Sequence, residues 1–310
     1  MNKIAVMGAG AVGCYFGGML ARGGFDVTLI ARGAQAEALA RSGLDLESIQ
    51  FRERIAVHAA TSPAAAQGAD LVLFCVKTRD TETASKALGP HVSRGAVVVS
   101  LQNGVDNLER MHAAAGLDAL ASVVYVAASV PEPGHVKHVG RGDLILGDPL
   151  RKDDVARVAA AFERAGVPCR VTGNIEGELW RKLVANCAGN AVSALAHSSY
   201  GRAWALEPAR ETMMAAALEA VEVARAAGVE LPPGDLVAYA MDLIGKFGPA
   251  SSSTRQDIEN HRPTEIEVLN GYIARRGREL GVPTPVNQTL FALVKLLEEG
   301  FQQSASQASS

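Results

Sequence analysis

A glycine-spaced turn lies near the start of the chain, between residues typical of a strand and residues typical of a helix. Residues 3 to 7 read KIAVM, and glycines follow at Gly8, Gly10 and Gly13. Gly8 permits a tight turn, and Gly13 allows a helix to pack closely on the strand. This spacing predicts a strand, a sharp turn and a helix from about Ala11. It also argues against a secretory signal, whose apolar core should be helical.

Short aliphatic runs alternate with alanine-rich amphipathic stretches from residue 3 to about residue 170. Such alternation is typical of a parallel sheet covered by helices on both faces. Around residues 119 to 147 the pattern changes to strands joined by Pro and Gly turns, which predicts antiparallel strands added at one edge. A helix over about 151 to 165 and a strand at VPCRV follow. The runs assigned to parallel strands are KIAVM, DVTLI, DLVLFCV and AVVVSL, and helices are expected from Ala11, Ala34 and Asp80.

The second half of the chain lacks strand patterns. From Ile175 to Gly300 apolar residues recur at helical spacing, interrupted by glycine and proline near 228, 232–233, 248–249 and 281–285. The predicted fold class is therefore α/β. A Rossmann-type domain with a parallel sheet and antiparallel edge strands is expected over residues 1–172, and an all-α domain over residues 173–301. The polar tail, residues 302–310, is expected to be disordered.

Composition narrows the class of protein. The chain has 310 residues, 48% hydrophobic and 20% charged, which suffices for two domains with a core each. A net charge of −3 offers no basic surface for nucleic acid, and no apolar run is long enough to span a bilayer. We expect a soluble cytoplasmic protein with neither nucleic acid nor a membrane as a partner.

Cysteine and histidine spacing gives no sign of a disulfide framework or a metal site. The four cysteines lie far apart and form no CxxC pair, which indicates reduced thiols. His135 and His138 lie three apart in a segment that reads as a strand, where such residues point to opposite faces. We therefore expect no bound metal. The cysteines are Cys14, Cys75, Cys169 and Cys187.

The strand-turn-helix context gives the glycine motif a function. Backbone amides at the start of a helix, with the helix dipole, bind phosphate, and a glycine at position 10 lets the backbone approach a pyrophosphate. A glycine-rich structural turn is the alternative, but the complete βαβ unit that follows favours dinucleotide binding. The predicted contacts are Gly8, Ala9, Gly10, Ala11, Val12 and Gly13.

The end of the second strand bears on which dinucleotide binds. NAD-binding versions of the motif usually carry an acidic residue there, which accepts hydrogen bonds from the ribose hydroxyls. In this chain DVTLI is followed by Ala31 and Arg32. A guanidinium can neutralise a 2′-phosphate, so the sequence favours NADP over NAD. The alternative is a solvated surface arginine.

Two further strand ends carry polar residues. Lys77 follows LVLFCV, and Asn103 lies in SLQNGV. Ligands of open parallel sheets bind outside the carboxyl ends of the strands. Lys77 can pair with a phosphate there, and Asn103 can bridge ribose or substrate. Each could instead cap the helix that follows.

The segment WRKLVANCAGN places a lysine and two asparagines four residues apart. On a helix Lys182, Asn186 and Asn190 share one stripe among apolar neighbours. Because an unpaired buried lysine or amide is costly, the stripe must face water or a polar ligand in a cleft. A solvent stripe beside Arg181 is the alternative. Two asparagines, which are poor helix formers, favour the cleft.

A second polar set lies late in the chain, in SSSTRQD and RPTEI. The serines follow a Gly-Pro break and can cap a helix or donate to an anion. Pro263, Thr264 and Glu265 also fit the ordinary start of a helix, so position alone does not make Glu265 functional.

Together these segments resemble the ketopantoate reductase family (2-dehydropantoate 2-reductase). The resemblance covers nearly the whole chain, and the ordered set of motifs is specific to the family. It comprises GAGAVG, Arg32, Lys77 at its strand end, LQNG, the WRKL…N…N helix, and SSSTRQD…RPTEIEVLNGYI.

The resemblance implies NADPH-dependent reduction of the 2-oxo group of ketopantoate to pantoate, a step toward pantothenate and coenzyme A. It implies Lys182 as the general acid and Glu265 as a residue that orients Lys182 or the substrate hydroxyl. It also implies substrate contacts at Asn103, Asn186, Asn190, Ser253 and Glu265. The implied cofactor contacts are those of the glycine motif together with Arg32, Lys77 and Asn103. An ammonium donor suits this chemistry, because hydride arriving at a ketone carbon leaves negative charge on oxygen.

Some features leave the assignment open. The family often has proline after the second helix asparagine, whereas this chain has Ala191, and Gly189 is small, so we expect a wider pocket. A related reductase of another branched or aromatic 2-oxo acid is one alternative, and a non-catalytic NADP-binding sensor is another. A β-hydroxyacid dehydrogenase fits by fold analogy alone. Residues 207–227 and 286–299 are apolar enough to pack in a homodimer and suit a monomer core equally well.

Overall fold

The computed structural model describes the backbone of residues 1–307 and the side chains as far as residue 301. The chain divides into two compact units, Met1–Ile175 and the residues from Glu176 onward. The predicted boundary, after residue 172, falls shortly before this division. Side chains of 302–307 and all of 308–310 lie outside the described residues, so the disorder expected for 302–310 stays a prediction.

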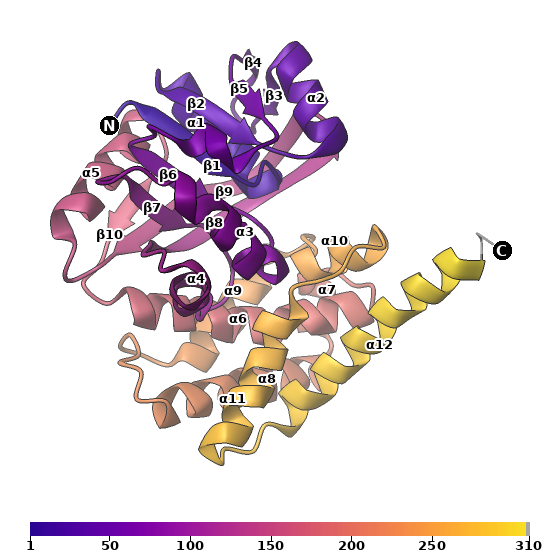
Figure 1. The fold of residues 1–310 in the computed structure, drawn as a ribbon. Coiled ribbons are helices and arrows are strands. Elements are labelled where there is room, and N and C mark those ends of the chain that lie inside the picture. Colours follow the sequence, from indigo (N-terminus) through magenta and orange to yellow (C-terminus); the bar gives the residue numbers. More distant parts are fainter. Residues whose placement is uncertain (308–310) are drawn as a thin grey trace. The chain divides into compact units, whose positions relative to one another are not determined.

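The first unit is built on one mixed sheet (Figure 1). Its strands are β1 (Lys3–Met7), β2 (Asp26–Ile30), β3 (Leu44–Glu47), β4 (Arg52–Ile55), β5 (His58–Ala60), β6 (Leu71–Phe74), β7 (Val97–Ser100), β8 (Leu120–Glu132), β9 (His135–Gly147) and β10 (Cys169–Val171). They lie in the order β4-β3-β9-β8-β7-β6-β1-β2-β5, with β10 paired to β9. In this order, each strand of the run β7-β6-β1-β2-β5 is parallel to its neighbours. β8 and β9 form a long antiparallel hairpin. The predicted parallel sheet with added antiparallel strands is confirmed.

The outermost strands on the hairpin side were not expected from the sequence. β3 pairs in parallel with β9, and β4 pairs antiparallel with β3, so the β8–β9 hairpin is not itself the sheet edge. Charged residues obscure the strand pattern over residues 44–55. They are accommodated in opposite-sign pairs across β3 and β4, such as Arg52 with Asp45, 2.7 Å apart.

Helices cover both faces of this sheet. They are α1 (Ala11–Arg22), α2 (Gly33–Ser42), α3 (Thr81–Leu88), α4 (Asn107–Ala115) and α5 (Lys152–Arg164), with 3₁₀ turns η1 (Pro63–Ala66), η2 (Thr78–Asp80) and η3 (Gly89–His91). Strand alternation divides the core in two. Ile4 and Val6 pack with residues of α1 and α5, whereas Ala5 between them packs with residues of α3 and α4. The period of two thus fixes which helices each strand contacts.

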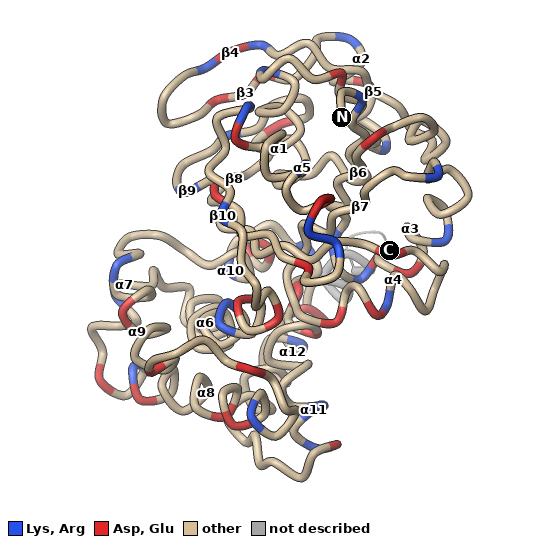
Figure 2. The backbone as a smooth tube through the Cα atoms, turned by 90° about the vertical axis from the view of Figure 1, so that its left-hand side faces the viewer, with Lys and Arg blue, Asp and Glu red and all other residues tan. Residues whose placement is uncertain are grey.

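The described residues of the second unit form helices joined by loops, with no strand among them, as predicted. It contains α6 (Ile175–Leu195), α7 (Tyr200–Ala205), α8 (Glu207–Ala226), α9 (Leu236–Phe247), α10 (Ser253–Glu259), η4 (Ile266–Val268), α11 (Asn270–Leu280) and α12 (Pro285–Gln307). In the part of the chain that the structure describes, no helix is both long and apolar enough to cross a membrane. Lys and Arg are interspersed with Asp and Glu along the chain (Figure 2).

A buried polar network ties α6 to three other helices. The carboxylate of Glu219, on α8, accepts hydrogen bonds from the Val286 and Asn287 amides at the start of α12, both 2.8 Å long. The Asn287 side chain accepts from the Asn270 amide at 2.9 Å, and Asn270 also donates to the Cys187 carbonyl of α6 at 3.0 Å. Such bonds fix the rotation of α6, because slippage would leave buried polar groups unpaired.

Candidate active site

The parallel register of the first sheet brings four predicted site segments to one edge. Met7 lies opposite both Ile30 and Phe74, and Phe74 lies opposite Ser100. The glycine motif, Arg32, Lys77 and Asn103 each follow one of these aligned strand ends. They therefore lie outside the carboxyl ends of β1, β2, β6 and β7, where ligands of open parallel sheets bind.

The glycine motif is built as the sequence predicts. Gly8 has φ +102°, and a side chain there would approach the Val76 nitrogen to 2.8 Å. A Cβ at Gly13 would lie 2.1 Å from the Gly8 carbonyl oxygen, so only glycine lets α1 pack this closely on its strand. Beside Gly10, in contrast, a Cβ would meet nothing within 4 Å.

The N-terminus of α1 has the properties of an anion site. Its N-cap residue, Gly10, provides no side-chain cap, and the first turn contains no acidic residue. The first amides of a helix lack partners within the helix and carry the positive end of its dipole. With open space beside Gly10, these amides fit the phosphates of a dinucleotide.

Gln35 supports this motif from the first turn of α2. Its side-chain amide donates to the Ala9 carbonyl at 3.0 Å and to the Cys14 sulfur at 3.3 Å. Its side-chain oxygen accepts from the Gly134 amide, in the turn of the β8–β9 hairpin, at 2.9 Å. The backbone around Ala9 is thus held by a residue that the sequence analysis passed over.

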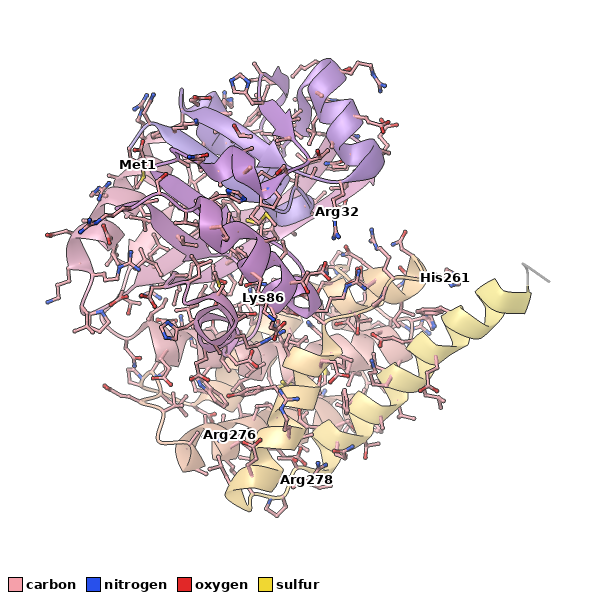
Figure 3. The ribbon with its side chains drawn as sticks, in the orientation of Figure 1. Met1, Arg32, Lys86, His261, Arg276 and Arg278 are labelled. Atoms are coloured by element: carbon pink, nitrogen blue, oxygen red, sulfur yellow. The ribbon has the colours of Figure 1, made fainter. Side chains whose placement is uncertain are left out.

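Arg32 stands at the N-cap of α2, directly beyond β2. Its side chain, labelled in Figure 3, pairs with the carboxylate of Asp80, with 3.4 Å between Nη2 and Oδ2. The Arg32 side chain is 87% exposed. A guanidinium in this position can accept a phosphate partner, and its exposure also fits the solvated alternative. The structure adds that Arg32 has an acidic neighbour, Asp80.

A polar network joins the segment that carries Lys77 to the segment that carries Asn103, between the two strand ends. The Gln102 side-chain amide donates to the Val76 carbonyl at 3.1 Å and to Thr81 Oγ1 at 2.8 Å. Asn107 donates to the Asn103 carbonyl at 2.6 Å. The alternative of capping receives no support at Lys77, whose side chain makes no cap bond to η2. Gln102, within the LQNG segment, is a positioning residue that the sequence analysis did not single out.

The polar stripe of α6, Lys182, Asn186 and Asn190, lies on a helix that is otherwise mostly buried. Lys182 and Asn186 are half-buried, and Asn190 is buried. The hydroxyl of Tyr200 donates to Asn190 Oδ1 at 2.7 Å, and the Asn190 carbonyl accepts from Ser252 Oγ at 3.0 Å. Asn190 is therefore partly committed to holding α7 and the start of α10 against α6.

Arg181 would be expected to point into solvent if the stripe faced water, but its side chain contacts other residues of the protein. Its guanidinium pairs with the buried carboxylate of Glu178 one turn earlier and lies 4.8 Å from the centre of the Tyr239 ring. Arg181 thus makes its own packing and ionic contacts.

The expected widening of the pocket at Gly189 is wrong. A Cβ at this position would lie 2.8 Å from the Tyr200 ring and 3.1 Å from Ile244. The volume that a larger residue would take is thus filled by these two side chains. Ala191 is fully buried. The small residues of α6 serve helix packing.

Ser253 and Glu265 stand at the starts of two short helices. Ser253 is exposed and is the first residue of α10, whose cap is Ser252, through a 2.9 Å bond from the Arg255 amide. Glu265 is half-buried and is the N-cap of η4. Its neighbour Thr264 is fixed by hydrogen bonds from its amide and hydroxyl to Glu298 of α12, 2.7 and 2.5 Å long.

The thiols are unsuited to nucleophilic or ligand roles. All four cysteines are free, and burial raises their pKa values, those of Cys14 and Cys169 to about 12. Across the described residues, no group of three or more His, Cys, Asp and Glu side chains is placed to hold a metal ion.

Comparison with known proteins identifies the family. A family model described as "Ketopantoate reductase PanE/ApbA" matches residues 4–150, and one described as "Ketopantoate reductase PanE/ApbA C terminal" matches residues 174–298. A 2-dehydropantoate 2-reductase of Halobacterium salinarum is 35% identical, with 96% of this chain and 99% of that protein covered. One of Archaeoglobus fulgidus is 33% identical, with coverage of 97% and 99%.

Solved structures agree. The PanE/ApbA family ketopantoate reductase of Ralstonia eutropha JMP134 is 47% identical, covers 97% of this chain and 99% of its own, and superposes with a TM-score of 0.91. A D-mandelate dehydrogenase with NADH and anilino(oxo)acetate has a TM-score of 0.89 at 24% identity, with coverage of 97% and 99%, and shows the shared fold alone. With both halves matched at this coverage, the chain belongs to the ketopantoate reductase PanE/ApbA family of NAD(P)-dependent oxidoreductases.

Proposed function

We propose that this protein reduces the 2-oxo group of 2-dehydropantoate to pantoate with NADPH, in pantothenate and coenzyme A biosynthesis. The observation that carries the proposal is the polar stripe of α6, which places a half-buried lysine among residues that are otherwise packed. The 2-dehydropantoate 2-reductases that match along nearly their full length support the substrate.

In this proposal Lys182 is the general acid. Its ammonium group stabilises the negative charge that develops on the carbonyl oxygen and delivers the proton. Asn186 can both donate to and accept from a substrate hydroxyl. Asn190 Oδ1 already accepts from Tyr200, and Asn190 Nδ2 can donate to a ligand. Ser253 donates to the carboxylate, and Glu265 orients Lys182 or the hydroxyl.

We assign cofactor binding to residues 1–172 and substrate binding to residues 173–301. The residues of the glycine motif hold the pyrophosphate, Arg32 holds the 2′-phosphate, and Lys77 pairs with phosphate. Asn103 contacts ribose or substrate. NADPH supplies the hydride. The uncapped start of α1 and the open space beside Gly10 support this assignment.

The test is NADPH oxidation, followed at 340 nm, with ketopantoate beside a panel of branched and aromatic 2-oxo acids. Ketopantoate should give the highest kcat/KM. Lys182→Ala should lower kcat by roughly a hundredfold or more, the size of a lost acid, while NADPH still binds. Lys246→Ala is the control, because it removes an exposed lysine charge from α9 of the same unit.

If another 2-oxo acid gives the highest kcat/KM, the proposed reaction type stands, but the assignment to pantothenate biosynthesis fails. Tight NADPH binding without turnover of any acid would favour the non-catalytic sensor. Gly189 faces packed side chains and therefore does not favour the related reductase of another 2-oxo acid.

A homodimer and a cytoplasmic location also belong to the proposal. Exposed apolar side chains occur on α8, at Met214 and Leu218, and on α12, at Leu293 and Leu296. Their exposure supports coverage by a second copy. Light scattering after gel filtration measures the mass; a monomer at micromolar concentration would contradict the dimer. The free thiols support a reducing compartment.

A further inference from the structure

Asp80 occupies a position where an acidic side chain ordinarily caps a helix, yet it does not do so. It is the N-cap residue of α3, where Asp is among the preferred residues. Its side chain makes no cap hydrogen bond there and instead pairs with Arg32, 48 residues earlier in the chain. A local role is thus replaced by a long-range one.

The pair of Arg32 and Asp80 flanks the glycine motif. Arg32 follows β2, Asp80 follows β6, and β1 lies between these two strands in the sheet. The motif that leaves β1 contacts both neighbours: the Gly8 amide donates to Ile30 of β2, and Gly8 packs on the backbone of Cys75 and Val76 beyond β6. A carboxylate therefore lies within an ion-pair distance of the guanidinium assigned to the 2′-phosphate.

We propose that Asp80 is a specificity-determining residue that weakens the preference for NADPH over NADH. The inference rests on the proposed function, in which Arg32 receives the 2′-phosphate. A phosphate at Arg32 must displace or approach the Asp80 carboxylate, and like charges at such distances repel. NADH has no phosphate there, and its ribose hydroxyls can donate to a carboxylate, as they do to the acidic residue of NAD-binding folds.

The chain thus combines two opposing groups. Arg32 favours NADPH, and Asp80 partly offsets that preference from a different strand end. Arg79 lies beside the same carboxylate, with 3.7 Å between its Nε and Asp80 Oδ1, but remains a weaker partner at that distance. Removing the charge of Asp80 while keeping its shape isolates its effect.

The experiment compares Asp80→Asn, Arg32→Ala and the double variant with the unaltered protein. Dissociation constants for NADPH and NADH are measured by cofactor fluorescence at one fixed ionic strength, and kcat/KM is measured with each cofactor. Asp80→Asn should tighten NADPH binding roughly three- to tenfold, the size expected of a partly exposed charge about 4 Å away, without tightening NADH binding. Glu37→Gln, which removes an exposed carboxylate from α2, is the matched control and should change neither constant by twofold.

The outcomes separate this inference from the proposed function. If Arg32→Ala leaves the ratio of NADPH to NADH affinity unchanged, the assignment of the 2′-phosphate to Arg32 fails. If Arg32→Ala lowers that ratio but Asp80→Asn leaves it within twofold, only the role of Asp80 fails. If Asp80→Asn tightened NADH binding as much as NADPH binding, the role of Asp80 would also fail, because the change would then reflect only the net charge of the protein.

Discussion

The glycine motif of the first unit and the polar stripe of the second are candidate sites that are built in opposite ways. At the motif, the backbone forms the site: amides at the start of α1, with space beside Gly10 and none at Gly13. At the stripe, side chains on a regular helix form it, and one of them, Asn190, is already bonded to Tyr200 and Ser252 through different atoms.

The difference shows what kind of pattern can be interpreted from sequence. A motif made of glycines has a local steric cause, because it depends on the absence of a Cβ at particular positions. The spacing of the glycines therefore predicts the local structure. A polar stripe depends on what packs around it. The same three residues would suit solvent, a ligand or neighbouring helices, and tertiary contacts divide them among these roles.

The largest effect should separate the last two glycines of the motif, Gly10 and Gly13. Gly13→Ala should cost roughly 3 kcal/mol or more of unfolding free energy, because its Cβ would lie 2.1 Å from the Gly8 carbonyl oxygen. Gly10→Ala should cost only about 1 kcal/mol, the size of a lost cap preference, yet weaken NADPH binding at least tenfold. Urea unfolding and fluorescence titration measure these quantities. Equal stability losses would refute the distinction between packing and approach.

At the stripe, Tyr200→Phe should cost about 1–3 kcal/mol, because Asn190 Oδ1 would lose its donor inside the protein. The control is Tyr239→Phe, which removes the hydroxyl from a half-buried ring and should cost less than about 0.5 kcal/mol. Chemical denaturation of both variants measures the difference. Similar values would mean that Asn190 is not held by Tyr200, and the stripe would then resemble a site built only for a ligand.

Gly189→Ala tests whether small residues on α6 serve packing or a pocket. We expect a loss of roughly 1 kcal/mol, since contact with the Tyr200 ring at 2.8 Å outweighs the helix preference for alanine. Ranking of 2-oxo acids by kcat/KM should not change. If the variant kept its stability but ranked the 2-oxo acids differently, the result would support a substrate pocket widened by Gly189.

The smallest effect concerns pH and the support of the Lys77 segment. Arg110 donates to the Thr78 carbonyl at 2.6 Å and pairs with Glu82, which lowers the pKa of that carboxyl below its ordinary 4.5. This contribution is fully present above the unfolded-state pKa and is lost as pH falls through the folded-state pKa. Since Glu82 is 45% exposed, we expect under about 1 kcal/mol between pH 7 and pH 3.

The difference between the unfolding free energies of the unaltered protein and Glu82→Gln, measured by urea titration across that range, isolates the pair. It should shrink toward zero as the carboxyl is protonated. A difference that stays constant with pH would show that the pair contributes nothing through its charge.

Much of the fold could be predicted from sequence because its causes are local. Aliphatic runs, alanine-rich stretches and breaks at glycine and proline determine the order of strands and helices, and the glycine motif determines how β1 joins α1. The strands β3 and β4 were not predicted because their charged residues find partners only in the folded protein. Asp45 lies opposite Arg54 and Glu47 opposite Arg52, and Glu47 also pairs with Lys137 of β9.

By itself the sequence determined the two-part architecture, the glycine turn between β1 and α1 and the identity of the polar residues. Tertiary structure alone decided their surroundings: that Gln35 and Gln102 brace the strand ends, that Gly189 faces Tyr200, and that Asp80 reaches Arg32 rather than capping α3. The physical reason is the distance along the chain over which each effect acts. Backbone sterics and periodicity act over a few residues, whereas burial and ion pairing depend on segments that only folding brings together.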